Sequence, residues 1–481
     1  MTLALDRPAT PTATVPTATV PPATVPPATT LPAVTGSGVR VPLVTGEQID
    51  YANLDLAASA PALRAVADHV ADVLPLLSSV HRGAGYLSQV STALLERARE
   101  CVGEFVGARP ASGPDGDVVV FTRNTTDALN LLARAVPGPV LRLDVEHHAN
   151  LLPWQGGRTV AAAPTVEETL QRLATALHAA PTALLTVTGA SNVTGEVLPL
   201  HRITALAHAA GARVAVDAAQ LAPHRRVDLA ATGVDYVALS GHKLYAPYGA
   251  GALVGRRDWL DAAAPHLAGG GAVTQVDLDA SEVTAAWAPA PHRHEGGTPN
   301  VLGAVALAQA CRTLTPVLDH VGPVHEQALL GRLAAGLASV PGVTTLRIWP
   351  DSADRVAVQS FTVAGLPAGL VAAYLSAEHG IGVRDGRFCA HPLLARLCPT
   401  ESPTGSPGAD GTAVRASIGL GTTAAHVDRL VAALHRLVTR GPAWTYAPVG
   451  GRWSPTPDPR DPDPLGVGVP GTAGIGCGAR A

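Results

Sequence analysis

A lysine and an aspartate stand at the ends of two predicted buried strands. Lys243 follows the predicted strand 235–239 in the segment Ser-Gly-His-Lys, and Asp217 ends the predicted strand 213–217. A carboxylate at a buried strand end needs a partner, because an unpaired buried charge is costly. A protonated pyridine nitrogen is one such partner, and the carboxylate would keep that ring cationic and able to accept electrons. A solvated surface lysine and a helix-capping aspartate are the structural alternatives.

Hydroxyl groups occur where a phosphate attached to such a ring could be bound. Thr125 and Thr126 lie at the start of a helical run that begins at Asp127. The first turn of a helix offers unpaired backbone N–H groups, which bind phosphate well. Ser240 and His242, next to the candidate lysine, could add two more contacts. A plain helix cap is the alternative for the two threonines.

A histidine and a cysteine are the other candidates for direct chemistry. His147 follows the predicted strand 140–145, and its flat ring could stack on a coenzyme, although metal ligation or a structural role would use the same residue type. Cys389 lies close to Arg384 and Arg387, which would favour the nucleophilic thiolate. A small buried hydrophobe is the alternative for a lone cysteine.

The elements that must position these residues alternate between strand and helix. Apolar side chains in 90–106 and 198–210 recur at helical spacing. Alternation of this kind predicts a mostly parallel sheet with helices on both faces. Ligands bind such sheets at the carboxyl ends of the strands, where the polar residues above are found. The buried-strand patterns are 118–121, 184–187, 213–217, 235–239 and 251–255.

The composition is that of a globular protein and excludes several classes. The 481 residues are 47% hydrophobic, enough for two or more domains. A net charge of -4 without clustered Lys and Arg argues against nucleic-acid binding. We expect no transmembrane helix, because no run of 18 or more uncharged apolar residues occurs. The N-terminus lacks a basic region followed by an apolar one, so no secretory signal is expected.

The cysteines argue against both a disulfide framework and a metal site. Their odd number and scattered positions do not fit paired disulfides. No pair has the CxxC spacing of a structural zinc site. A reducing cytoplasm is therefore the expected location. The five are Cys101, Cys311, Cys389, Cys398 and Cys477.

Taken together, nine segments resemble the class V aminotransferase-like enzymes, which depend on pyridoxal 5′-phosphate (PLP). The chain is most similar to their cysteine desulfurase and selenocysteine lyase subgroup, including its RxGxxC motif at 384–389. The resemblance covers about residues 45–440. It implies an α/β protein of PLP-dependent transferase fold type I, with a smaller α+β domain. The segments are HRG (81–83), TRNTTDALN (122–130), EHHAN (146–150), SNVTG (191–195), DAAQ (217–220), SGHK (240–243), EGGTPN (295–300), RDGRFCAHP (384–392) and VRAS (414–417).

The resemblance implies how the coenzyme is held. Lys243 would form the Schiff base and later move protons, Asp217 would bind the pyridine nitrogen, and His147 would stack on the ring. Gln220 would contact the phenolic oxygen. Thr298 would reach the phosphate of a neighbouring subunit, which implies a homodimer with shared active sites. The remaining coenzyme contacts would come from Thr125, Thr126, Asn192, Ser240 and His242.

The resemblance also implies the substrate and the reaction. Arg415 would bind the carboxylate of an amino acid in a two-pronged pair, with Asn192 and Arg384 as further substrate contacts. L-cysteine would become L-alanine, and Cys389 would receive the sulfur as a persulfide for a sulfur-acceptor protein. A C–S lyase, an epimerase, a transaminase and a selenocysteine lyase are the alternatives within the fold. A non-catalytic scaffold is the alternative outside enzymes.

Two features differ from close relatives in that subgroup. A low-complexity insertion at 400–412 lengthens the connection between Cys389 and Arg415, and Ile418 to Thr423 replace a Tyr-Asn-Thr segment. The predicted parts of the chain are a disordered Pro/Ala/Thr-rich tail (1–36), an N-terminal segment that joins the small domain (37–69), a large PLP-binding domain (70–315), a small C-terminal domain (316–445) and a disordered Pro/Gly-rich tail (446–481).

Overall fold

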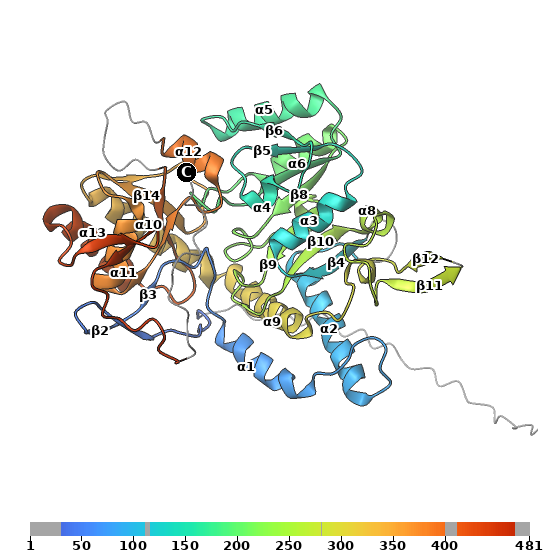
Figure 1. Ribbon diagram of the computed structural model, residues 1–481. Coiled ribbons are helices and arrows are strands. Elements are labelled where there is room, and N and C mark those ends of the chain that lie inside the picture. Colours follow the sequence, from blue (N-terminus) through green and yellow to red (C-terminus); the bar gives the residue numbers. More distant parts are fainter. Residues whose placement is uncertain (1–29, 111–115, 280, 400–410, 467–481) are drawn as a thin grey trace, which may run out of the picture.

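A computed structural model describes residues 30–110, 116–279, 281–399 and 411–466. Most of the predicted N-terminal tail, the insertion up to residue 410, and residues 467–481 lie outside this described part. Within it, a large sheet with its helices lies beside a smaller sheet with its own helices (Figure 1).

A seven-stranded sheet forms the centre of the larger part. Strand β10 runs antiparallel to both of its neighbours, and the other neighbouring strands pair in parallel. Its central strands β7, β8 and β9 are buried along almost their whole length because helices cover both faces, and the prediction of a mostly parallel sheet is confirmed. The strands are, in spatial order, β4 (Asp117–Thr122), β10 (Gly251–Arg256), β9 (Tyr236–Ser240), β8 (Arg213–Asp217), β7 (Leu184–Thr188), β5 (Val140–Leu143) and β6 (Arg158–Val160).

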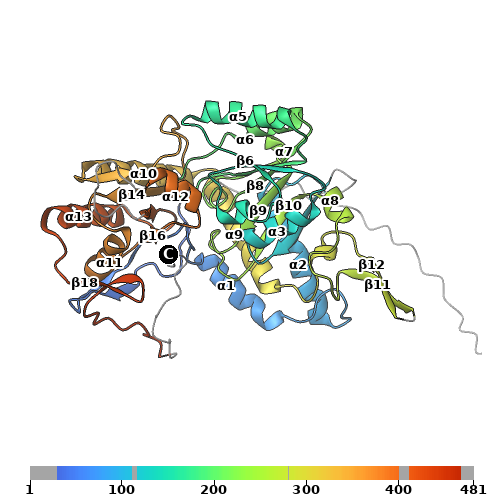
Figure 2. The same cartoon turned by 45° about the horizontal axis from the view of Figure 1, so that its top comes forward.

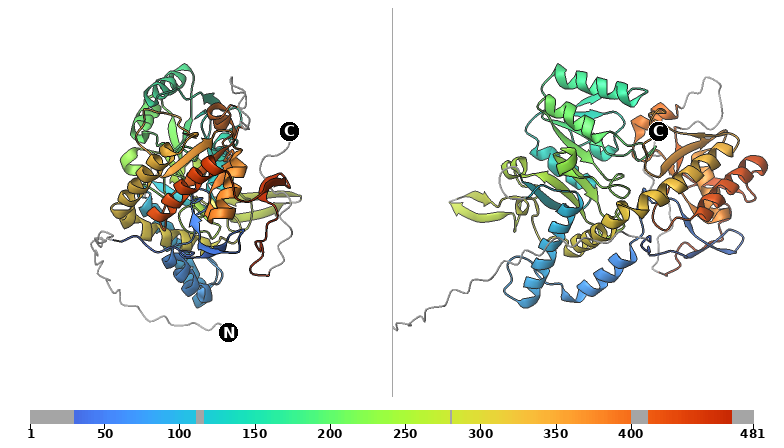
Figure 3. Two further views of the ribbon diagram at one scale, coloured as in Figure 1. Left: turned by 90° about the vertical axis from the view of Figure 1, so that its left-hand side faces the viewer. Right: turned by 180° about the vertical axis from the view of Figure 1, so that it is seen from behind.

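Alternate residues of one strand pack into different hydrophobic clusters. Val118 and Val120 of β4 pack with α3 (Thr125–Ala135), whereas Val119 packs with the cluster that includes α2 (Tyr86–Phe105). This is the two-residue period of a strand between two helical layers. Figure 3 shows these layers from two further sides. The other helices here are α1 (Arg64–Val73), α4 (His148–Leu151), α5 (Val166–Ala179), α6 (Leu200–Ala209), α7 (Leu229–Thr232), α8 (Arg257–Ala262) and α9 (Val301–Leu318).

Helix α9 is long and apolar enough to cross a membrane by length and composition alone. About two thirds of it, 67%, is buried inside the protein. It packs against α1 and α2, and its buried face belongs to the hydrophobic core. It is therefore a core helix. The domain boundary predicted at residues 315 and 316 falls inside this helix.

The smaller part is an antiparallel sheet covered by helices. Strand β3 (Ala52–Asn53) pairs with β15 (Ile381–Gly382), and Leu54 joins the smaller part's core. Ala52 and Leu54 of the predicted N-terminal segment (37–69) thus contribute to this core, and the assignment of the whole segment to the small domain stays a prediction. The sheet order is β13 (Val343–Thr345), β14 (Val358–Val363), β17 (Ala413–Ser417) and β16 (Arg384–Gly386), with helices α10 (Val321–Ser339), α11 (Ala368–His379), α12 (His391–Leu397) and α13 (Ala424–Arg440).

Three hairpins lie outside these layers. One of them, β11–β12, projects away from the larger sheet (Figure 2). Short 3-10 turns at Leu74–Leu76 and His292–His294 complete the elements. The hairpin strands are β1 (Arg40–Pro42) with β2 (Gln48–Asp50), β11 (Val273–Asp279) with β12 (Glu282–Trp287), and β18 (Tyr446–Val449) with β19 (Arg452–Pro455).

The predicted tails are wrong where they enter the described part. Strands β18 and β19 form a hairpin on α11, where Glu378 accepts hydrogen bonds from the backbone of Trp444 and from the hydroxyl of Tyr446. At the other end, Val34 is buried and bridges to Leu63. A prediction of disorder from Pro and Gly content overlooks the few aromatic and apolar anchors that these segments contain.

Candidate functional site

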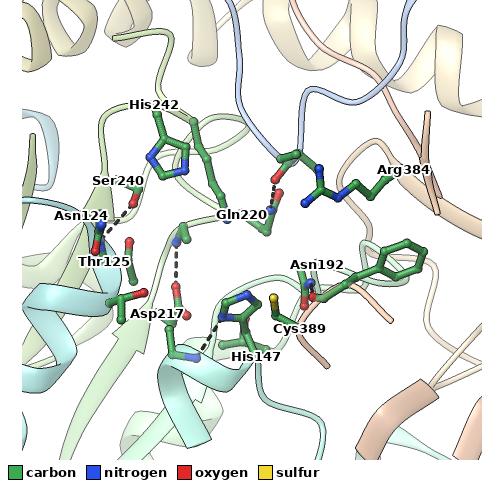
Figure 4. Close-up of a pocket in the computed structure, with 18 of the residues that line it drawn as sticks. Asn124, Thr125, His147, Asn192, Asp217, Gln220, Ser240, His242, Arg384 and Cys389 are labelled. Carbon is green, nitrogen blue, oxygen red and sulfur yellow. Dashed lines mark hydrogen bonds between the residues drawn. The ribbon is translucent and has the colours of Figure 1, made fainter. Parts of the chain in front are cut away.

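A cavity of about 230 Å³ opens where the carboxyl ends of the large sheet's strands meet the smaller part (Figure 4). It brings together every site residue predicted from the sequence except Thr298. The predicted residues that line it are Thr125, Thr126, His147, Asn192, Asp217, Gln220, Ser240, His242, Lys243, Arg384, Cys389 and Arg415.

Lys243 reaches the cavity from the turn that follows β9. It is the single lysine of the 481-residue chain. Burial lowers the pKa of its amine to about 8, with Arg415 adding to the shift and Asp217 opposing it. A substantial fraction of the amine is therefore neutral near pH 8, and the neutral amine is the form that attacks an aldehyde.

Asp217 ends β8 and points into the cavity. It is only 3% exposed and accepts a hydrogen bond of 3.0 Å from the backbone N–H of Ala219. Burial raises the pKa of this carboxyl group, and the charge of Lys243 opposes the shift. A cation beside it would remove that penalty. Gln220, three residues beyond the end of β8, is held by a 2.7 Å bond from its amide to the carbonyl oxygen of Ala57.

A second acid lies beneath the cavity and was not predicted. Glu146 is fully buried and accepts a 2.7 Å bond from the side chain of Asn150. Burial raises the pKa of Glu146 to about 8, and the nearby Asp217 and Asp144 add to the shift. Glu146 is therefore mostly protonated at neutral pH. Its position within the EHHAN segment was the only sequence signal.

The turn between β4 and α3 forms a polar cradle at one end of the cavity. Asn124 caps α3 by accepting from the N–H of Asp127, and the N–H of Thr125 donates to Ser240 over 3.0 Å. Within the described residues, the buried Thr125 Oγ1 has no hydrogen-bond partner. A phosphate at this helix start would supply an acceptor for it. Thr126 and His242 complete the lining at this end.

Gly251 lets this cradle approach the sheet. A Cβ atom on Gly251 would lie 2.6 Å from the Cα of Asn124 and 2.5 Å from the carbonyl oxygen of Leu239. Both are backbone atoms, which cannot yield as a flexible side chain can. A glycine in β10 is therefore required beside the β4–α3 turn.

His147 forms one wall of the cavity at the start of α4. Its Nδ1 accepts a 3.0 Å hydrogen bond from the N–H of Ala149, which fixes the ring. Burial lowers the pKa of His147 to about 3, and the charges of Lys243, His148 and Arg415 add to the shift. The ring is neutral at physiological pH and suited to stacking.

The Cys389 side chain enters the cavity from the loop before α12, near His147 in Figure 4. Phe388 and Cys389 both have left-handed backbone, with φ of 51° and 52°. Such a conformation costs a non-glycine residue about 1 to 2 kcal/mol. It is held by the side chain of Asn192, which donates to the carbonyl oxygen of Phe388 over 2.8 Å. Arg384 lines the cavity, whereas Arg387 is exposed and does not.

Arg415 is a buried cation at the opposite end of the cavity from the cradle's hydroxyls. It is 3% exposed and donates to the carbonyl oxygen of Asn192 over 2.9 Å and to Asp55 over 3.3 Å. In the described part of the chain its Nε has no partner. Burial lowers the pKa of Arg415, and Asp55 opposes the shift. Such a guanidinium can still bind a carboxylate.

Asp55 was missed by the sequence reasoning. It lies between Arg415 and Arg384, 3.3 Å from one guanidinium and 3.7 Å from the other. Asp55 and Arg415 are 360 positions apart, so no local pattern could have paired them. Burial raises the pKa of the Asp55 carboxyl group, and the charges of Arg415 and Arg384 oppose this shift.

Thr298 lies on an exposed loop and does not line the cavity. The loop is anchored by Glu295, which accepts two bonds of 2.8 and 2.9 Å from Arg99 and one from the N–H of Phe121. The expectation that Thr298 reaches a second subunit stays a prediction.

The residues present fit PLP. A neutral amine, a buried carboxylate and a neutral flat ring surround one cavity. Two buried donors without partners in the described residues, Thr125 Oγ1 and Arg415 Nε, suit two separate anions, a phosphate and a carboxylate.

Known proteins share this sequence and this architecture. The Aminotransferase class-V family matches residues 52–430. A cysteine desulfurase of Dickeya dadantii is 37% identical over 409 residues, covering 82% of this chain and 93% of that protein. The apo structure of a cysteine desulfurase from Thermococcus onnurineus is 30% identical with a TM-score of 0.70, covering 81% and 94% of the two chains. The Escherichia coli cysteine desulfurase CsdA, solved as an S-sulfonic acid, is 31% identical with a TM-score of 0.67, over 81% and 94%.

Proposed function

The chain belongs to the class V aminotransferase family, and on that premise we propose that it is a PLP-dependent cysteine desulfurase. It converts L-cysteine to L-alanine and retains the sulfur on Cys389. The observation that carries this proposal is the placement of the Cys389 thiol in one cavity with Lys243 and Arg415. This arrangement offers an amine for the coenzyme, a cation for the substrate carboxylate and a thiol for its sulfur.

The coenzyme would be held at both ends. Lys243 would attach it covalently, Asp217 would pair with its ring nitrogen, and His147 would cover its ring. Thr125, Thr126, Ser240 and His242 would bind its phosphate. When bound, the coenzyme supplies an electron sink for the pair released at the substrate Cα.

Different side chains would bind the substrate, transfer its protons and accept its sulfur. Arg415 and Asn192 would hold the substrate carboxylate, with Arg384 at the mouth of the cavity. Lys243 would take the proton from the substrate Cα and later return protons. The Cys389 thiolate would attack the substrate sulfur, so that an S–S bond forms while the C–S bond breaks and leaves its electron pair on Cβ. Protonation of Cβ completes L-alanine.

A product assay with L-cysteine separates this function from its rivals. Purified holoenzyme with limiting L-cysteine is expected to give one L-alanine for each persulfide formed on the protein, because the sulfur moves to Cys389 and the amino group is retained. Both products are measured by mass spectrometry after acid quench.

Each rival would give a different result in that assay. A C–S lyase would release pyruvate and ammonia in place of alanine. A selenocysteine lyase would act on L-selenocysteine and leave L-cysteine unchanged. A scaffold would turn over neither substrate. Any of these results would overturn the proposed function.

Uptake of PLP by coenzyme-free protein should accelerate with rising pH and level off above about pH 8, because burial lowers the pKa of Lys243 to about 8. Below that pH the amine is protonated and cannot attack the aldehyde, and above it the amine is neutral. Stopped-flow absorbance measures the rate, with N-acetyl-lysine in the same buffers as a reference amine of ordinary pKa. A rate that keeps rising to about pH 10, like that of an unperturbed lysine, would contradict the lowered pKa.

Two copies of the chain would complete the assembly. The projecting hairpin exposes Val276, Leu278 and Val283, which are between 54% and 73% exposed. An isolated two-stranded hairpin with apolar faces is marginally stable in water, and contact with another subunit would cover it. We also propose that the sulfur passes on to an acceptor protein and that the enzyme works in the cytoplasm, where the thiol of Cys389 stays reduced between turnovers.

A further inference from the structure

His148 contacts the Cys389 loop on both sides of Ala390. Its backbone N–H donates to the carbonyl oxygen of Cys389 over 2.8 Å. Its Nε2 lies 3.3 Å from the backbone N–H of His391 and accepts from it. Because His391 is the first residue of α12, that N–H has no acceptor within its own helix. His148 of α4 thus makes hydrogen bonds to both ends of the turn from Cys389 to His391, which carries the thiol.

The ring of His148 is well suited to this contact. It packs edge-on against the ring of His391, with centroids 4.6 Å apart and an interplanar angle of 73°. Burial lowers the pKa of His148, and His391 adds to the shift, so the ring is neutral at physiological pH. A neutral imidazole that accepts at Nε2 carries its proton on Nδ1.

This contact supports a strained segment. Phe388 and Cys389 hold left-handed backbone, and such a conformation persists only where the surroundings fix it. Asn192 holds the near side through the carbonyl oxygen of Phe388. The far side, from Cys389 to His391, is held by His148.

We propose that His148 is a positioning residue for sulfur transfer. Through the acceptor at Nε2 it fixes the start of α12 and so holds the Cys389 thiol toward the reacting sulfur. His148 and His391 do not line the cavity, so neither is a catalytic residue. The inference rests on the proposed function, because it concerns the thiol that receives the sulfur.

The test compares His148→Ala, His148→Gln and His148→Asn in the holoenzyme. A glutamine places an amide oxygen near the position of Nε2, whereas an asparagine is too short to reach it. His391→Ala is the matched control, since it removes the facing ring and keeps the backbone N–H that donates to His148. Single-turnover persulfide formation at Cys389 is followed by mass spectrometry, with the coenzyme absorbance and the KM for L-cysteine as separate readouts.

We expect persulfide formation to slow roughly three- to tenfold in His148→Ala and His148→Asn, the effect of one lost hydrogen bond. His148→Gln should recover most of the rate, and His391→Ala should stay close to the native rate. The coenzyme band and the KM should not change, because Lys243 and Arg415 are untouched. A merely structural role would lower coenzyme content and raise KM together.

Several results would overturn the inference. They are a native rate in His148→Ala, or equal rates in His148→Gln and His148→Asn. If His148→Ala does not fold, the comparison of the glutamine and asparagine variants decides alone. Cys389→Ala distinguishes a failure of the positioning role from a failure of the proposed function. If it abolishes persulfide formation while the His148 variants are native, the positioning role fails and the proposed function stands.

Discussion

Lys243→Ala is expected to yield a protein without the absorbance band of a lysine Schiff base and with L-cysteine turnover reduced by more than about 10³-fold. The variant loses both the covalent link and the base that takes the substrate proton, and proton transfer alone contributes about 10² to 10⁴. No other lysine exists in the chain to replace it. Absorbance spectra after incubation with PLP and alanine production from L-cysteine measure the two effects.

Lys243→Arg is the matched control for the charge. It keeps a cation beside Asp217 but cannot bind the aldehyde reversibly, so it should be as inactive as the alanine variant. Folding is checked by the thermal midpoint of each protein. A Lys243→Ala protein that still shows the coenzyme band and near-native turnover would refute the assignment of this amine.

Cys389→Ala should keep the coenzyme band and lose sulfur transfer from L-cysteine by at least about 10²-fold. The reason is that the thiol accepts the substrate sulfur, whereas Lys243 and Asp217, which would hold the coenzyme, are unchanged in this variant. The absorbance change on adding L-cysteine should persist, because substrate binding and proton removal do not need the thiol. Alanine and protein persulfide are both quantified under single-turnover conditions.

Cys398→Ala is the control for this variant. Cys398 follows the other end of α12, does not line the cavity and is likewise partly buried, so its loss should leave turnover unchanged. Native turnover in Cys389→Ala, or loss of turnover in Cys398→Ala, would show that the nucleophile is not Cys389.

The sequence was sufficient for the part of the site that lies along the large sheet. Asp217 ends a strand, and Lys243 and His147 each follow one. Hydrophobic runs in the sequence predict all three strands, and parallel strands bring their carboxyl ends to one edge of the sheet. The alternating pattern likewise predicted the sheet and its two helical layers. The ordered motifs then supplied Arg415 and Cys389, which the pattern alone could not place near Lys243.

The contacts that were missed join distant parts of the chain. Asp55 meets Arg415 across 360 positions, and His148 meets the Cys389 loop from another element. Neither depends on a local spacing, so no periodicity could show it. The prediction of disorder for residues 446–455 failed for a different reason. The Pro- and Gly-rich composition drew attention away from the aromatic residues that pack on α11.

Because Lys243 is the single lysine of the chain, proteolysis can measure the fraction of chains that carry a coenzyme on its amine. A protease that cuts only after lysine has one target in the whole sequence, between residues 243 and 244. Denatured protein with a bare amine is divided there into two pieces. Reductive fixation of a ligand on that nitrogen hides the target and leaves the polypeptide whole. The proportion of intact chain on a gel is thus a direct count of loaded sites.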